Sequence, residues 1–242
     1  TMATPWLCRP FEWGADLMVH STTKFLSGQG NAMGGIVIDS GRFPWFGNAK
    51  YPSLSEPCPD YNGLTFSETF GDMAFTLYSH AVSLRDLGCT QSPMNAWITL
   101  NGVETLPLRM ERHVENAEKV AGFLQQHPSV EWVSYAGLSS SPYYKLAQKY
   151  LQGKAGSVFT FGIRGGYESG LRLLEKVELF SHVSNIGDSR SLILHPASTT
   201  HRQLSDEQRL TAGAGPEVIR LSVGIESAED LIADLEQALE GL

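Results

Sequence analysis

The chain has 242 residues, 42% hydrophobic and 18% charged, a balance typical of a globular protein with one large domain or two small ones. Its net charge of −8 argues against a nucleic-acid partner, and no apolar run approaches the roughly 20 residues of a membrane span. Cys8, Cys58 and Cys89 share no metal-ligand spacing, so we expect no metal, and so few thiols favour a reduced, cytoplasmic protein over a secreted disulfide scaffold.

The first hundred residues predict two short buried strands and a long irregular loop. The apolar runs DLMVH (16–20) and GGIVID (34–39) are typical of buried strands. Residues 41–70 are rich in Pro, Gly, Tyr and Ser, and a loop of this length in a compact domain is usually functional or covers an interface. Helical patterns follow over residues 72–87 and 93–101.

A long amphipathic helix is predicted over residues 104–128, where apolar residues recur at spacings of three and four and Pro128 marks the end. Such a helix would join two domains. Beyond it, strands and helices mix without a regular βαβ rhythm, which suggests an α+β unit. Strands are predicted at 130–135, 157–163, 180–186, 191–194 and 218–223, and helices at 143–151, 169–178 and 228–239.

Lys24 lies between the first two predicted strands, in HSTTKFLSGQGNAMGG (20–35). A lysine amine can form a Schiff base with the carbonyl of a substrate or of pyridoxal phosphate (PLP). Ser21 and Thr23 flank it closely enough to hold the phosphate of a cofactor bonded to it, and the glycines that follow allow the backbone to approach closely. The alternative is a surface lysine in a Ser/Thr-rich turn, and spacing alone favours that alternative.

Linked motifs along nearly the whole chain resemble the Cys/Met-metabolism family of PLP enzymes. TPWLCRPFEWGADLMV followed by HSTTKFLSGQGNAMGG is similar to the family's PLP-lysine segment, and residues 84–120 are similar to its interdomain region. HPASTTH (195–201) and VIRLSVGIES (218–227) are similar to its C-terminal substrate-binding motifs. The resemblance implies an α/β PLP-dependent transferase fold (fold type I). Residues 1–103 would form the C-terminal part of the large PLP-binding domain, and 104–242 a smaller C-terminal α+β domain with the linking helix.

The resemblance also implies roles for five residues. Lys24 is the catalytic Schiff-base lysine, which later moves protons between substrate carbons, and Ser21 and Thr23 hold the PLP phosphate. Arg220 binds the substrate α-carboxylate, and Asn185 lies near that carboxylate. A guanidinium suits a carboxylate because it makes two parallel hydrogen bonds. Without the resemblance, a buried structural ion pair would be the preferred interpretation of Arg220.

The insertion at 41–70 and the segment LNGVETLPLRMERH are similar to the O-acetylhomoserine sulfhydrylase subfamily. This implies γ-replacement in methionine and cysteine biosynthesis (trans-sulfuration), in which O-acetyl-L-homoserine and sulfide or a thiol give L-homocysteine and acetate. A cytoplasmic homotetramer is expected. Methionine γ-lyase or cystathionine γ-synthase/lyase-type activity is an alternative, and so is an inactive fragment. A cofactor-independent lysine aldolase would need a barrel rhythm, which the chain lacks.

Two departures from the family pattern bear on activity. Gln29 stands where the family often has His, which puts the contacts of the glycine segment in doubt. The family's Asp that pairs with the PLP ring nitrogen belongs just before Thr1. We therefore expect this chain to be the C-terminal portion of a longer enzyme, and to need an upstream N-terminal segment to hold PLP in a competent state.

Overall fold

The computed structural model describes residues 1–242 and separates into two compact units. Unit 1 contains Thr1–Cys8, Ser21–Met33 and Trp97–Leu242, and unit 2 contains Arg9–His20 and Gly34–Ala96. The segment that carries Lys24 therefore belongs to the same unit as the C-terminal part of the chain. The division between residues 103 and 104 inferred from the sequence stays a prediction.

Unit 1 is built on a five-stranded mixed sheet with strand order β3-β4-β7-β6-β5. The strands are β3 (Val130–Ser134), β4 (Val158–Ile163), β5 (Ser181–His182), β6 (Leu192–Leu194) and β7 (Val218–Ser222). β5 and β6 pair in parallel, and the other neighbours are antiparallel. β5 stops at His182, short of the predicted residue 186. The chain leaves the sheet there, because a turn in which the Asn185 amide bonds the Val183 carbonyl follows directly.

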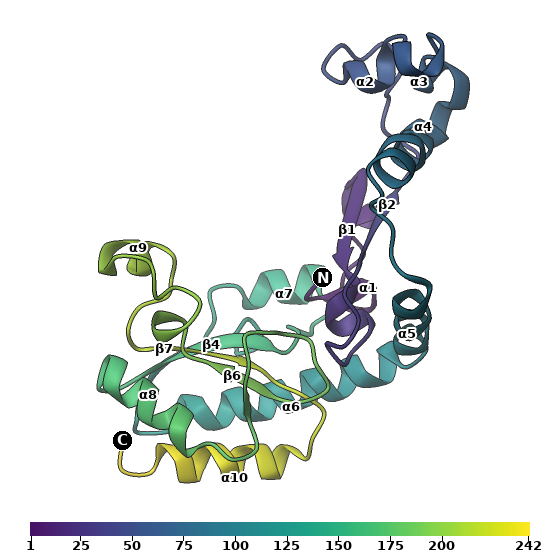
Figure 1. The fold of residues 1–242 in the computed structure, drawn as a ribbon. Coiled ribbons are helices and arrows are strands. Elements are labelled where there is room, and N and C mark those ends of the chain that lie inside the picture. The colour runs from purple at the N-terminus through teal and green to yellow at the C-terminus, as the bar shows by residue number, and fades with distance from the viewer. The chain divides into compact units, whose positions relative to one another are not determined.

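Three helices cover one face of this sheet (Figure 1): α6 (Leu106–Gln126), α8 (Gly166–Lys176) and α10 (Ala228–Leu239). Their apolar sides form one core with β4 and β7, in which Leu124, Leu173 and Leu235 have no exposed surface. Unit 1 also contains α1 (Thr4–Leu7), most of α5 (Pro93–Glu104), α7 (Tyr144–Tyr150) and α9 (Asp206–Thr211). None of the helices combines the length and apolar composition needed to cross a membrane.

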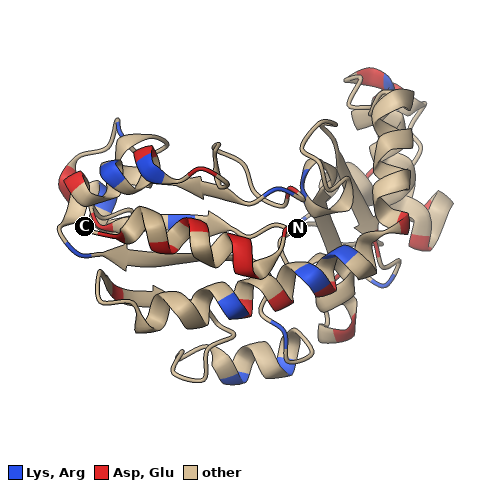
Figure 2. Ribbon diagram, turned by 90° about the horizontal axis from the view of Figure 1, so that it is seen from below, with Lys and Arg blue, Asp and Glu red and all other residues tan.

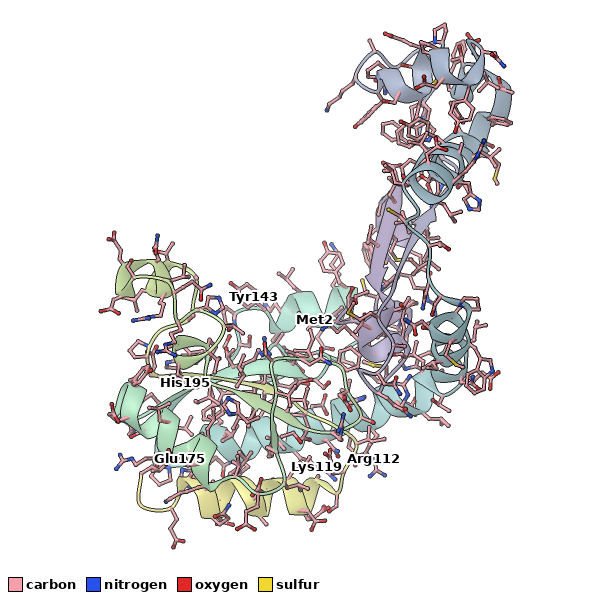
Figure 3. The ribbon with its side chains drawn as sticks, in the orientation of Figure 1. Met2, Arg112, Lys119, Tyr143, Glu175 and His195 are labelled. Atoms are coloured by element: carbon pink, nitrogen blue, oxygen red, sulfur yellow. The ribbon has the colours of Figure 1, made fainter.

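The outer sides of the covering helices carry the charged residues of both signs that Figure 2 shows. Arg112 and Lys119 lie on the exposed side of α6 (Figure 3), where the Lys119 ammonium pairs with Glu115 at 3.0 Å and reaches Glu229 at 3.9 Å. Exposed pairs of this kind contribute little to stability, because water and salt screen them. The apolar core therefore stabilises the layered arrangement far more than these surface pairs do.

The alternation of side chains along β7 determines the face of the sheet on which Arg220 lies. Ile219 and Leu221 are completely buried toward the covering helices. Because successive side chains of a strand point to opposite faces, Arg220 lies on the face away from those helices. In the register of the sheet, Arg220 stands between Thr160 of β4 and Leu194 of β6.

Unit 2 contains the two-stranded sheet of β1 (Leu17–Ser21) and β2 (Gly35–Asp39), except that Ser21 itself falls in unit 1. Its α-helices include α2 (Pro52–Ser55), α3 (Phe66–Phe70) and α4 (Ala74–Tyr78), and the π-helical Ser79–Asp86 follows α4. The expectation of an irregular loop over 41–70 was wrong in part, because α2 and α3 fold around buried aromatic rings. Trp45 stacks on Phe75 with ring centroids 5.6 Å apart, and Phe66 packs edge-on against Tyr78 at 5.1 Å.

Candidate active site

Lys24 lies in a π-helical turn, Thr22–Leu26, which directly follows β1. Its backbone leaves the helical region (φ −89°, ψ −134°), so the turn is kinked at the lysine itself. The Gly28 amide bonds the Lys24 carbonyl at 2.8 Å, and Phe25 is completely buried. The anchored neighbours fix the lysine backbone, while its side chain remains partly exposed.

Three of the predicted site residues are joined by hydrogen bonds. The Lys24 ammonium donates to the side-chain oxygen of Asn185, and Nη2 of Arg220 donates to the Asn185 backbone carbonyl at 3.1 Å. The lysine and Asn185 are 161 positions apart in the chain, and Arg220 is a further 35 positions on. An amine and a guanidinium therefore both donate hydrogen bonds to one amide residue.

Arg220 has the surroundings of an anion-binding group. It is partly buried, and this burial lowers the pKa of its guanidinium from the usual value. No acidic side chain forms an ion pair with it. The alternative of a structural ion pair, which the sequence left open, therefore finds no support. A half-buried cation without a counter-ion is stabilised by an incoming carboxylate.

The loop that carries Asn185 is held against the lysine segment by backbone contacts. The Ser189 amide bonds the Gly28 carbonyl at 2.8 Å, and the Gly187 amide bonds the Ser222 hydroxyl at 2.9 Å. A Cβ added to Gly187 would lie 2.8 Å from the Phe25 nitrogen and 3.1 Å from the Lys24 Cβ. Glycine at this position allows the loop to pass directly over the lysine backbone.

Replacing Gly187 by alanine should destabilise the folded protein. The position has φ +74°, and the added methyl would also overlap the Phe25 amide. We expect a loss of about 1–3 kcal/mol in the free energy of unfolding, measured by urea denaturation. Gly213→Ala is the matched control, because φ is +68° there but nothing lies within 4 Å of the added Cβ. Equal losses in the two variants would contradict the close approach of the loop.

The two predicted phosphate-binding residues lie in the same local segment as Lys24. Ser21 is the last residue of β1, and Thr23 is inside the kinked turn. Thr22 was missed at the sequence level, and its buried hydroxyl has no hydrogen-bond partner. Ser21 and Thr23 are only partly buried and lie within three residues of the amine, a combination suited to a phosphate-bearing aldehyde.

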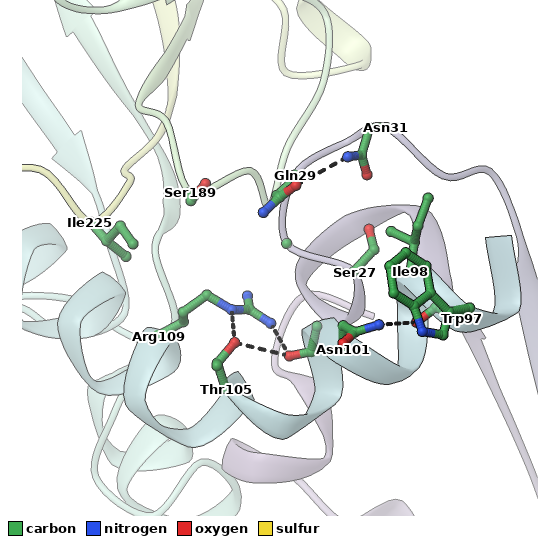
Figure 4. A pocket seen from close by; sticks show the side chains of 12 residues that line it. Ser27, Gln29, Asn31, Trp97, Ile98, Asn101, Thr105, Arg109, Ser189 and Ile225 are labelled. Atoms are coloured by element: carbon green, nitrogen blue, oxygen red, sulfur yellow. Dashed lines mark hydrogen bonds between the residues drawn. The ribbon is translucent and has the colours of Figure 1, made fainter. Parts of the chain in front are cut away.

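A cavity of about 510 Å³ borders the glycine-rich segment after the lysine. Gln29 lines it and accepts a hydrogen bond from Asn31, while Arg109 donates to the Thr105 hydroxyl and the Gly102 carbonyl (Figure 4). Burial lowers the pKa of Arg109. Lys24 does not line this cavity, so the cavity is not assigned as the place where the Lys24 amine reacts. The position where the sequence departs from the family is therefore in a cavity wall beside the lysine segment.

His113 of α6 is a buried group that the sequence-level interpretation overlooked. Its imidazole is completely buried, and its Nδ1 donates to the Val223 carbonyl at 2.7 Å. A carbonyl only accepts, so this bond fixes the proton of the neutral ring on Nδ1. Burial is the main cause that lowers the pKa of His113 to about 4; the Val223 bond opposes the shift and the nearby Arg109 contributes to it. The folded protein therefore favours the neutral imidazole at neutral pH.

This shift makes stability depend on pH in a defined direction. The unfolded chain binds the proton near the ordinary pKa of 6.5 and the folded chain only near 4, so stability falls as the pH drops from 6.5 toward 4. We expect His113 to contribute about 2 kcal/mol to the difference in unfolding free energy between pH 7 and pH 5. Urea denaturation at both values should show a smaller difference for His113→Phe. An unchanged difference would contradict the shift.

The family described as Cys/Met metabolism PLP-dependent enzyme matches residues 1–240. An O-acetyl-L-homoserine sulfhydrylase of Leptospira meyeri is 50% identical over 100% of this chain and 57% of its own length. A homocysteine synthase of Schizosaccharomyces pombe is 45% identical over 97% of this chain and 55% of its own length. The chain thus spans about half the length of the curated relatives it matches.

The fold is shared with a solved structure. A putative O-acetylhomoserine (thiol)-lyase from Campylobacter jejuni, which contains a pyridoxyl-lysine phosphate, superposes with a TM-score of 0.95 at 44% identity. The match covers 100% of this chain and 57% of that one. The α/β fold of PLP-dependent enzymes expected from the sequence is therefore confirmed, and so is the resemblance on which that expectation was based. The chain belongs to the Cys/Met metabolism family of PLP-dependent enzymes.

Proposed function

We propose that this chain takes part in PLP-dependent γ-replacement, in which O-acetyl-L-homoserine and sulfide or a thiol give L-homocysteine and acetate. The observation that carries the proposal is the hydrogen-bonded group of Lys24, Asn185 and Arg220. It combines an amine for covalent chemistry with a guanidinium for an amino-acid carboxylate. The similarity to relatives named for this reaction supports the choice of substrates.

Lys24 has two tasks in this proposal. Its amine bonds the aldehyde of PLP, and when released it moves protons at the substrate carbons. PLP, when bound, supplies the sink for the electrons that a deprotonated amino-acid carbon releases. Asn185 accepts a hydrogen bond from the Lys24 ammonium with its side chain and one from Arg220 with its backbone carbonyl, and so links the two groups. Arg220 orients the substrate through its carboxylate, which brings the α-carbon within reach of the amine.

Ser21 and Thr23 are proposed to hold the PLP phosphate. Ser21 ends β1 and Thr23 lies in the kinked turn that follows, so both precede Lys24 by no more than three residues.

The proposal concerns the complete protein, because the chain spans only about half the length of its relatives. In that protein, we propose that an upstream N-terminal segment and a homotetrameric assembly supply the groups that lie outside this chain. Residues 1–103 would then belong to the PLP-binding domain and 104–242 to the C-terminal domain.

The test is an assay of the complete protein with O-acetyl-L-homoserine and sulfide. We expect L-homocysteine and acetate in equal amounts, with little 2-oxobutyrate and ammonia. Formation of 2-oxobutyrate and ammonia as the main products would assign elimination instead and overturn the proposed replacement. A protein that consumes no O-acetyl-L-homoserine at all would overturn the choice of substrate.

A further inference from the structure

One side of α6 contacts both segments that carry the candidate reactive groups. Arg109 reaches the lysine segment, where its Nη2 donates to the Leu26 carbonyl at 3.5 Å. Two turns further along the helix, Asn116 donates to the carbonyls of Gly224 and Glu226 at 3.0 and 2.8 Å, just beyond the end of β7. These bonds tie one part of α6 to the lysine segment and another part to β7.

His113 lies between these two residues and contacts both segments with one ring. Its Nδ1 donates to the Val223 carbonyl at 2.7 Å, three residues beyond Arg220. Its ring packs edge-on against Phe25, with centroids 5.2 Å apart and an interplanar angle of 89°. Phe25 adjoins Lys24, and both rings are completely buried. A single rigid side chain therefore spans the distance from the neighbour of the lysine to the end of the strand that carries the arginine.

The backbone is held in place at both residues that His113 contacts, Phe25 and Val223. The Phe25 amide is covered by Gly187, which leaves no room for even a methyl group. The Val223 amide bonds the Ser157 carbonyl at 2.9 Å and continues the pairing of β7 with β4. A shift of the imidazole would therefore be transmitted to the backbone on both sides, because packed interiors respond to small changes in shape.

We propose that His113 is a positioning residue that sets the separation between the Lys24 amine and the Arg220 guanidinium. The ring contact determines where the lysine segment lies, and the Nδ1–H bond determines where the end of β7 lies. The inference rests on the proposed function for its kinetic consequences, since only a substrate held by both groups makes their separation matter.

Two substitutions separate the contacts. His113→Phe keeps an aromatic ring against Phe25 but leaves the Val223 carbonyl without its donor. His113→Asn places an amide donor near the former Nδ1 but removes the ring. In the complete protein, we expect His113→Phe to raise KM for O-acetyl-L-homoserine about tenfold with kcat nearly unchanged, since one buried hydrogen bond is lost. We expect His113→Asn to lower kcat about tenfold with KM nearly unchanged, since one aromatic contact is lost.

Hydrogen exchange provides a measurement that does not depend on activity. Exchange should become faster in residues 219–224 for His113→Phe and in residues 22–28 for His113→Asn. His195→Phe is the matched control, because His195 is also completely buried, bonds the Pro216 carbonyl at 2.8 Å and packs edge-on against Tyr167. It should accelerate exchange near residues 214–218 and leave residues 22–28 unchanged.

The outcomes are distinct. If both variants lower kcat and raise KM to the same extent, and exchange becomes equally faster in both segments, His113 is an ordinary core residue. That result would overturn the positioning role. If the unsubstituted protein forms no homocysteine, the proposed function fails, and the exchange pattern alone decides whether His113 couples the two segments.

Discussion

Replacing Lys24 by alanine should lower kcat for homocysteine formation in the complete protein by at least about 10³-fold. A positioned acid or base alone contributes about 10²–10⁴-fold, and the same amine is also proposed to bond the cofactor. The side chain is partly exposed and contributes a hydrogen bond to Asn185 but little to the core, so folding should be nearly unaffected. The measurement is a homocysteine assay on protein whose folding has been verified by thermal denaturation.

Lys24→Arg is the matched control for charge. It keeps a cation that can bond Asn185 but cannot form the covalent bond, so it should be as inactive as the alanine variant. Activity above about a tenth of the original in either variant would contradict the assignment, because a lost acid or base costs at least about 10²-fold.

Replacing Arg220 by lysine should lower kcat/KM for O-acetyl-L-homoserine by about 10²-fold, equivalent to about 3 kcal/mol. The positive charge is kept, but the fork that makes two parallel bonds to a carboxylate is lost. The effect should appear chiefly in KM. It should cost little stability, because no ion pair breaks and the bond to the Asn185 carbonyl at 3.1 Å can be made by an ammonium.

Sulfide provides an internal control for this variant, because it has no carboxylate. The KM for sulfide should change by less than about twofold, while the KM for O-acetyl-L-homoserine rises by one to two orders of magnitude. An unchanged KM for O-acetyl-L-homoserine would contradict the role of Arg220. An equal rise in the KM values for O-acetyl-L-homoserine and sulfide would also contradict it.

Local patterns in the sequence predicted much of unit 1 correctly. The helix expected at 228–239 is α10 (Ala228–Leu239), where strong apolar periodicity is joined to a cap in which Ser227 accepts from the Asp230 amide. The helix expected at 104–128 is α6, which begins and ends two residues inside that range. In contrast, α9 was missed, although its capping box of Ser205 and Gln208 is readable in the sequence. Its six residues were too few for a periodic apolar signal.

Unit 2 shows the opposite case, where composition misled. Proline, glycine and tyrosine over residues 41–70 predicted an irregular loop, but Trp45 and Phe66 gather neighbouring rings into a small core. Short helices then form because packing, rather than propensity, stabilises them.

Predicting the candidate site from the sequence required two kinds of information. Spacing drew attention to Lys24 and its hydroxyl neighbours but alone favoured a surface lysine. No local pattern joins Lys24 to Asn185 and Arg220, which come from distant parts of the chain. Only the resemblance to a family connected these three residues before the structure did. His113 was missed because a polar residue on an amphipathic helix is usually taken as solvent-facing. Its spacing of three from Met110 and four from Ala117 places it on the buried side.

Trapping the Schiff base would show whether Lys24 is the residue that bonds PLP. The complete protein would be incubated with PLP, reduced with borohydride, digested and mapped by mass spectrometry. We expect the pyridoxyl phosphate group on the peptide that contains Lys24. The corresponding peptide of the Lys24→Arg variant should carry no such group. An unmodified Lys24 peptide at saturating PLP, or a modification confined to another lysine, would contradict the account.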